Sequence, residues 1–368
     1  MEKETEQPAV NVEEIQQEYQ KIVKFMGSHD KFQDLREKAR KCLNPTPREL
    51  LYREHSVSLY YYPPKEGVEA KVQRPLLVVP SLVNKPCIMD LFEGESFISG
   101  MLERGVAVYM LEWGEPTPGQ RKSSLYQYLK QYLGRAVRRT RRHAGSDTVY
   151  LAGYCLGGTL SVLYSALDRG EQIAGLCTMV TPLNFHDKGL LSWWAKEEHF
   201  DVDKIVDSYG NIPADFFASS FPWLVPTASI KKAKTLMNKQ EDEAFLINFL
   251  ALDIWLTENI DFPGEVYREV IKKGYQKNVL TNEKSWKFEE EEARLSDINF
   301  PVLNMVAQYD HVSPADSCAV LEDLLDNANV ETASYPGGHL SFALGRDVRN
   351  KHTSVYWDKI AGWLESID

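Results

Sequence analysis

Short apolar runs alternate with amphipathic stretches of helical spacing along most of the chain. Each run has the length of a buried strand, and each stretch has the repeat of a helix that packs on one side. Such alternation is typical of a mostly parallel central sheet with helices on both faces, so we expect an α/β protein. The runs are 76–79, 106–113, 149–152, 173–180, 301–307 and 330–335.

An N-terminal segment, residues 1–50, precedes this pattern. Apolar residues recur at helical spacing over residues 12–26 and again over 32–42. Asn11 is placed to cap the first helix, and Pro45 lies just beyond the second. We therefore expect a tail and a helical pair before the sheet.

The strand rhythm fails over residues 181–288, which are rich in Trp, Phe, Pro and Lys and contain no convincing strand. We interpret this stretch as a helical cap inserted over the sheet. Enzymes built on α/β sheets often carry a mobile lid at this place. The core is then expected in two parts, residues 51–180 before the cap and 289–368 after it.

Charge and hydropathy exclude some classes of protein. The formal net charge is -11, which argues against a nucleic-acid partner bound through its phosphates. No run of about 18 uncharged apolar residues is present, so we expect no membrane span. The acidic residues 1–14 lack the pattern of a secretory signal, so we expect a cytoplasmic protein.

Five cysteines are scattered without a Cys-x-x-Cys pair, which argues against both a zinc site and a disulfide framework. We therefore expect free thiols, no metal and no cofactor. The five are Cys42, Cys87, Cys155, Cys177 and Cys318.

One cysteine stands in a distinctive setting. The predicted strand at 149–152 leads into Gly153-Tyr154-Cys155-Leu156-Gly157, and a helical pattern follows. Strand, Gly-x-nucleophile-x-Gly and helix together form the nucleophile elbow of the α/β-hydrolase fold. The turn puts Cys155 at a helix N-terminus, which favours the thiolate. We predict that Cys155 is a nucleophile; the alternative is an inert, buried cysteine, which describes the other four better.

The acid and the base of such an enzyme follow later strands, in the order nucleophile, acid, base. Asp310 follows the predicted strand 301–307, and His339 follows the next predicted strand. An ordinary turn aspartate and a loop histidine are the alternatives, but both residues stand where the fold needs them. We predict a Cys155, Asp310 and His339 triad, with His311 only packed nearby.

Two backbone amides are expected to form an oxyanion hole. Leu156 follows the nucleophile, and Val83 lies in the loop after the predicted strand 76–79. A basic cluster at 138–143 could bind phosphates, but it also ends a helix just before Gly145, where cations complement the helix dipole. We favour the second interpretation.

A cysteine nucleophile suits acyl transfer better than hydrolysis, because an enzyme thioester stays reactive toward an alcohol. Two other classes remain open. One is a cysteine hydrolase of the dienelactone hydrolase type, which the large aromatic insertion speaks against. The other is a non-catalytic binding protein on the same scaffold, which the complete triad speaks against.

Four motifs connect the chain to a known family: GYCLGGT at 153–159, VPSLVNK at 79–85, YDHVSP at 309–314 and GGH at 337–339. With them the chain resembles polyhydroxyalkanoate synthases from about Leu50 to its C-terminus. The short N-terminal region and IDFPGE at 260–265 resemble the short catalytic subunits of class III or class IV.

This resemblance implies polymerisation of (R)-3-hydroxyacyl-CoA, mainly 3-hydroxybutyryl-CoA, into polyester with release of CoA. Cys155 would hold the growing chain as a thioester and His339 would be the general base. Asp310 would either orient His339 or help activate the monomer's hydroxyl. Lys85 and the basic helix end are the candidates to meet CoA phosphates.

The resemblance also implies a set of partners. The CoA thioester is then the substrate, and no further cofactor is expected. A companion synthase subunit, homo-oligomerisation and a place at the surface of cytoplasmic polyester granules are expected as well.

Overall fold

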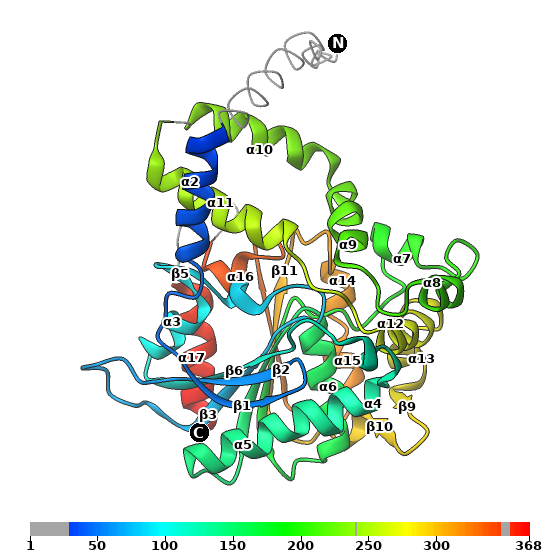
Figure 1. Cartoon of the computed structure of the whole chain (residues 1–368). Helices are drawn as coiled ribbons and strands as arrows, with labels where there is room; N and C mark the ends of the chain where they lie inside the picture. Colours follow the sequence, from blue (N-terminus) through cyan, green and yellow to red (C-terminus); the bar gives the residue numbers. More distant parts are fainter. Residues whose placement is uncertain (1–28, 240, 347–353) are drawn as a thin grey trace, which may run out of the picture.

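The computed structural model describes residues 29–239, 241–346 and 354–368, so the first predicted helix, residues 12–26, lies outside the described part. Within that part eight strands form one sheet, in the order β1-β2-β6-β3-β7-β8-β11-β12 (Figure 1). Neighbours from β6 to β12 run parallel, whereas β2 is antiparallel to β1 and β6. The strands are β1 Glu49–Glu54, β2 Val57–Tyr62, β3 Val72–Val79, β6 Val106–Glu112, β7 Val149–Tyr154, β8 Ile173–Met179, β11 Val302–Ala307 and β12 Val330–Tyr335.

All six predicted strands are present, which confirms the mostly parallel sheet. The edge hairpin of β1 and β2 was not predicted. It turns at His55, whose φ of 52° is a conformation more usual for Gly or Asn in such turns. The sequence therefore lacks the usual hairpin signal at this point.

Helices cover both faces of the sheet, as predicted (Figure 1). Alternate residues of β3 serve the two faces: Leu77 and Val79 pack in one hydrophobic core, Leu76 and Val78 in the other. The main covering helices are α5 Gly134–Ala144 and α6 Leu156–Asp168 on the first face, and α3 Phe97–Leu102 and α17 Val355–Ile367 on the second.

The chain between β8 and β11 is mostly helical. Its helices are α7 Leu190–Trp194, α8 Val202–Tyr209, α9 Ala214–Ser220, η4 Phe221–Leu224, α10 Pro226–Asn238, α11 Glu243–Thr257, α12 Gly264–Glu269, η5 Val270–Gln276 and α13 Val279–Glu283. One short strand, β9 Ser285–Lys287, corrects the expectation of no strand before residue 288. It pairs with β10 Glu292–Arg294, so the expected cap boundary falls inside a hairpin.

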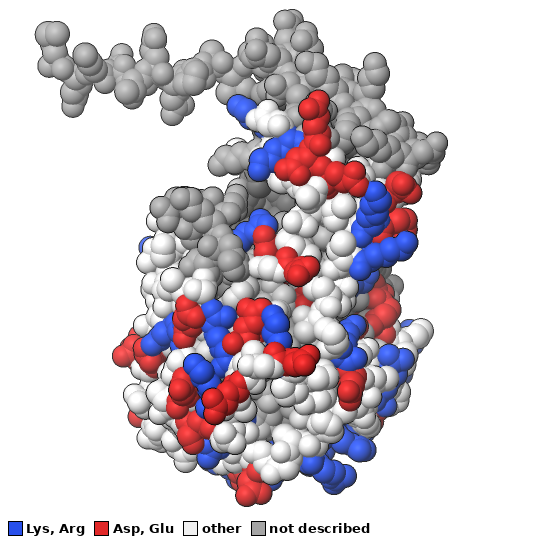
Figure 2. All heavy atoms as spheres, turned by 90° about the vertical axis from the view of Figure 1, so that its left-hand side faces the viewer, with Lys and Arg blue, Asp and Glu red and all other residues white. Residues whose placement is uncertain are grey.

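The second N-terminal helix is confirmed as α2 His29–Lys41, and it packs against α11 (Figure 1). The remaining short helices in the described ranges are η1 Pro86–Met89, η2 Pro118–Lys122, α4 Leu125–Gln127, η3 Tyr128–Leu133, η6 Leu295–Asp297, α14 Ala315–Cys318, α15 Leu321–Leu324 and α16 Ser341–Leu344. Of the helices in the described ranges, none combines the length and apolar character needed to cross a membrane. On the face shown in Figure 2, acidic and basic side chains are interspersed.

Candidate active site

Cys155 forms the whole connection between β7, which ends at Tyr154, and α6, which begins at Leu156. Its backbone has φ 55° and ψ -131°, a region that non-glycine residues rarely occupy. The Cys155 amide donates to the Met179 carbonyl at 2.9 Å, and the Gly158 amide donates to the Cys155 carbonyl at 2.8 Å. These bonds hold the strained turn.

The glycines of the elbow permit a close crossing of backbones. A Cβ at Gly153 would overlap the Cα of Gly158, and a Cβ at Gly157 would overlap the Val79 carbonyl. The spacing seen in the sequence therefore has a steric cause in the packing of α6 against β7 and β3.

The three predicted catalytic side chains lie together at the carboxyl ends of their strands. His339 Nδ1 lies 2.7 Å from Asp310 Oδ2, and the side chain of His339 lines the same recess as Cys155. Asp310 Oδ1 accepts hydrogen bonds from the backbone amides of Val312 at 2.8 Å and Ser313 at 3.0 Å, and these bonds fix the carboxylate. The Asp310 side chain is fully buried and that of His339 is 14% exposed.

The electrostatics of the cluster favour a charged imidazole. Burial alone lowers the pKa of His339, but the charges of Asp310 and Cys155 and their hydrogen bonds outweigh it and hold that pKa well above its ordinary value. A histidine of this kind can store and return a proton beside a thiolate.

The rival residues lie elsewhere. His311 is exposed, and its position next to Asp310 does not bring it into the hydrogen-bonded cluster. Burial raises the pKa of Cys87 to about 12 and also raises the pKa of Cys177 and of Cys318, which suppresses the thiolates of all three.

The two predicted oxyanion donors flank Cys155. Leu156 is the first residue of α6, and the amides of a first helical turn have no partner within the helix. Val83 lines the same cavity as Cys155, but its amide donates to Ser81 Oγ at 3.2 Å. An oxyanion at Val83 therefore has to compete with the Ser81 hydroxyl.

A cavity of about 160 Å³ opens beside Cys155, and nearly all of its lining is apolar. Aromatic side chains from the segment between β8 and β11 form a large part of its wall, so the cavity is suited to an aliphatic chain. Those aromatic residues are Trp194, Phe200, Phe216, Phe217, Phe221, Phe262, Tyr267 and Tyr275.

A smaller recess lies against the same thiol. Tyr154, Cys155 and His339 line it together with residues of the 80–85 loop and Trp255. Tyr154 was not singled out from the sequence, yet its hydroxyl donates to the His339 carbonyl at 2.9 Å and so supports the histidine. The sequence around Tyr154 does not indicate that its hydroxyl contacts the loop that carries His339.

The basic cluster is confirmed as a helix end: α5 stops at Gly145, which has φ 65°. Arg135 and three arginines of the cluster line a separate pocket with Tyr52, and none of the four lines the cavity or the recess at Cys155. Within the ranges that the structure describes, His, Cys, Asp and Glu side chains form no group of three suited to a metal ion.

Known proteins resemble this chain over most of its length. It is 34% identical over 87% of its residues to the poly(3-hydroxyalkanoate) polymerase subunit PhaC of Allochromatium vinosum, covering 88% of that protein. Identity is 33% to the protein of the same name from Synechocystis sp., with 84% of that protein covered. It is 31% for the one from Haloferax mediterranei, of which this chain spans only 64%.

The fold has wider parallels. The α/β hydrolase fold family matches residues 74–345. A solved structure, the monoacylglycerol lipase of Paleococcus ferrophilus, matches with a TM-score of 0.52 at 15% identity, over 86% of this chain and 100% of that one. At this identity the likeness concerns the fold alone.

Proposed function

Because this chain belongs to the poly(3-hydroxyalkanoate) polymerase family, which has the α/β-hydrolase fold, we propose that it polymerises (R)-3-hydroxyacyl-CoA into polyester and releases CoA. The observation that carries this proposal is the similarity to polymerase subunits over most of the chain. A cysteine elbow beside an apolar cavity supports the same chemistry.

The proposed first step is acylation of Cys155. His339 takes the proton of the Cys155 thiol, and the sulfur attacks the thioester carbonyl. The bond to the CoA sulfur then breaks, and His339 gives the proton to CoA, which leaves as a thiol. Amides at Leu156 and Val83 would stabilise the oxyanion that forms in between. The 2.7 Å contact with Asp310 supports the role of His339 as the base.

Chain growth then needs an alcohol instead of water. The 3-hydroxyl of a second acyl-CoA attacks the Cys155 thioester, its proton passes to His339, and an ester forms as the cysteine leaves. Cys155 next attacks the lengthened CoA thioester and releases one CoA per added unit. The apolar cavity wall favours this outcome, because it excludes water from the acyl-enzyme.

The test is incubation with 3-hydroxybutyryl-CoA while thiol release and turbidity are followed together. Polymerisation predicts that both rise, and that Cys155→Ala abolishes both. Thiol release with free 3-hydroxybutyrate and no turbidity would instead identify a cysteine hydrolase. No release and no labelling of Cys155 by a thiol reagent would identify a binding protein.

We propose further that the chain acts with a companion subunit, as a class III or class IV enzyme that also self-associates. The word "subunit" in the names of its relatives supports this. The purified chain should then show a long lag that a cognate companion abolishes. Full polymerisation without a lag by the chain alone, at low protein concentration, would overturn the proposal.

Two further proposals concern the motion of segment 181–288 and the location of the protein in the cell. We propose that this segment is a cap that opens for monomer and polymer, so limited proteolysis should cut it before the core from residue 301 onward.

We also propose that the protein works at the surface of cytoplasmic polyester granules. The exposed Trp193 and Trp223 in this segment support contact with an apolar polymer, and co-sedimentation with amorphous polyester tests it.

A further inference from the structure

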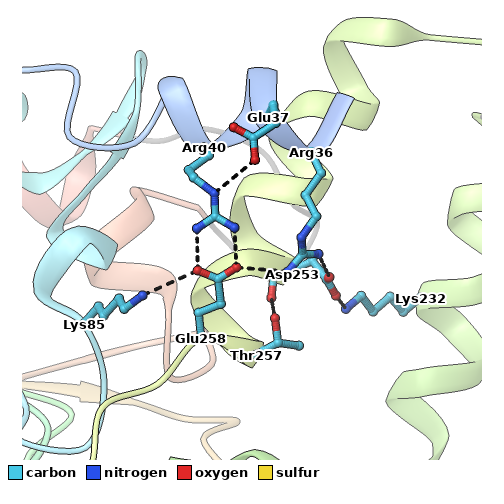
Figure 3. A network of polar contacts seen from close by, with 8 residues as sticks. All are labelled: Arg36, Glu37, Arg40, Lys85, Lys232, Asp253, Thr257 and Glu258. Atoms are coloured by element: carbon cyan, nitrogen blue, oxygen red, sulfur yellow. Dashed lines mark hydrogen bonds and ion pairs between the residues drawn. The ribbon is translucent and has the colours of Figure 1, made fainter. Parts of the chain in front are cut away.

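Helix α2 lies outside the residues that match the α/β hydrolase family, yet it is tied to α11 by several ion pairs (Figure 3). Arg36 Nη1 lies 3.3 Å from Asp253 Oδ2. Lys38 Nζ lies 2.6 Å from Glu243 Oε1, toward the other end of α11. The N-terminal segment is thus attached to a helix of the inserted region.

Glu258, the residue that follows the last residue of α11, is the centre of this contact. Arg40 donates to both carboxylate oxygens, at 2.6 and 2.7 Å, and Arg36 donates to one of them at 3.2 Å. On its other side Glu258 faces Lys85 Nζ at 3.5 Å (Figure 3). Mainly because of the Arg40 hydrogen bonds, the pKa of Glu258 falls to about 2, so the carboxylate is charged at neutral pH.

The same end of α11 also holds the backbone of the 80–85 loop. Trp255 Nε1 donates to the Lys85 carbonyl at 2.8 Å, and Asn84 Nδ2 donates to Asn259 Oδ1. Three residues within 255–259 therefore fix the 80–85 loop: Trp255 holds its backbone, and Glu258 and Asn259 hold its side chains.

This loop borders the reacting atoms. Val83 lines the apolar cavity beside Cys155, and Lys85 lines the recess shared by Cys155 and His339. We propose that Glu258 is a positioning residue, which uses Arg40 of α2 and Lys85 to hold the Val83 amide in place for the oxyanion. This inference rests on the proposed function.

Stability alone does not account for this arrangement. The Arg40 side chain is 43% exposed and that of Lys85 41%, and ion pairs of that exposure contribute little to the free energy of unfolding. A donor aimed at a developing charge, in contrast, acts only when its position is fixed beforehand. The effect of Glu258 is therefore expected in catalysis more than in stability.

Glu258→Gln tests whether Glu258 positions the loop. Lys38→Met is the matched control, because this substitution removes an ion pair between α2 and α11 but leaves the contacts of the 80–85 loop intact. Alkylation of Cys155 by iodoacetamide needs the thiolate but no oxyanion donor, whereas acyl transfer needs both. We expect Glu258→Gln to lower kcat with 3-hydroxybutyryl-CoA about tenfold and to leave the alkylation rate unchanged. Glu258→Asp should recover part of the loss, and Lys38→Met should behave as wild type.

Equal kcat in Glu258→Gln and wild type would overturn the inference, as would a parallel loss of kcat and alkylation. A second measurement does not depend on the reaction. Amide hydrogen exchange over residues 81–85 should be faster in Glu258→Gln than in Lys38→Met, and equal exchange would also overturn the inference. If wild type itself fails to turn over the thioester, the proposed function fails, while the exchange result still decides the role of Glu258.

Discussion

His339 Nδ1 and Asp310 Oδ2 lie 2.7 Å apart, and this contact determines which nitrogen of the imidazole is left for the proposed nucleophile. With Nδ1 engaged by the carboxylate, Nε2 is the nitrogen left for Cys155. The proposed acid and nucleophile are thus assigned to different nitrogens of one imidazole, and each of the three side chains can be replaced separately.

His339→Gln should suppress alkylation of Cys155 at neutral pH, because no other group in the cluster can take the thiol proton. The measurement is the rate of iodoacetamide labelling at pH 7. His311→Gln is the control, since its side chain is exposed and lies one residue from Asp310. Equal labelling rates in wild type and His339→Gln would refute the base role.

Asp310→Asn should separate the two roles open to the carboxylate. If Asp310 helps activate the monomer's hydroxyl, first acylation and alkylation stay measurable while chain growth slows. If it only orients His339, both steps decline together. Single-turnover CoA release compared with steady-state polymerisation distinguishes these outcomes.

Cys155→Ala should abolish turnover and leave the protein folded, and Cys155→Ser should be very poor, because its ester would resist transfer to an alcohol. CoA release and circular dichroism are the measurements. Cys177→Ala is the control: this thiol is fully buried in β8, so its loss should lower stability and spare activity. Fast polymerisation by the serine variant would contradict the thioester argument.

Phe221→Ala should widen the cavity beside Cys155 and raise the relative kcat/KM for a 3-hydroxyacyl-CoA two carbons longer, by about tenfold. Phe221 lines that cavity, whereas Trp223 on the same helical turn is 66% exposed and does not. Trp223→Ala should therefore leave the preference unchanged. An unaltered preference in Phe221→Ala would mean that the acyl chain lies elsewhere.

The stability contribution of Glu258 should depend on pH with a defined sign. Its pKa is lowered to about 2 in the folded protein, from an ordinary 4.5, so its contribution is complete above pH 4.5 and is lost as pH falls toward 2. Because its partners Arg40 and Lys85 are exposed, the difference in urea unfolding between wild type and Glu258→Gln should be small at pH 7 and pH 5, and smaller still at pH 3.5. A difference that grows on acidification would contradict the assignment.

The sequence was sufficient to predict what depends on local pattern. Asp310 follows a buried, mainly apolar strand, His339 follows a strand of mixed polar and apolar residues, and the elbow has glycines at fixed spacing around Cys155. The hairpin of β1 and β2 was missed because its turn has no glycine or asparagine. Arg40 and Glu258 are 218 residues apart, so nothing near either residue announces their contact.

The backbone conformation of Cys155 lowers the stability of the protein at the residue on which its proposed activity depends. Its φ of 55° and ψ of -131° cost about 1–3 kcal/mol for any residue with a Cβ, and glycine alone avoids most of that cost. Cys155→Gly should therefore resist urea better than Cys155→Ala, although both lack the thiol. Selection of variants for thermal tolerance alone would then favour loss of the nucleophile, so any such screen of this protein has to retain an activity filter.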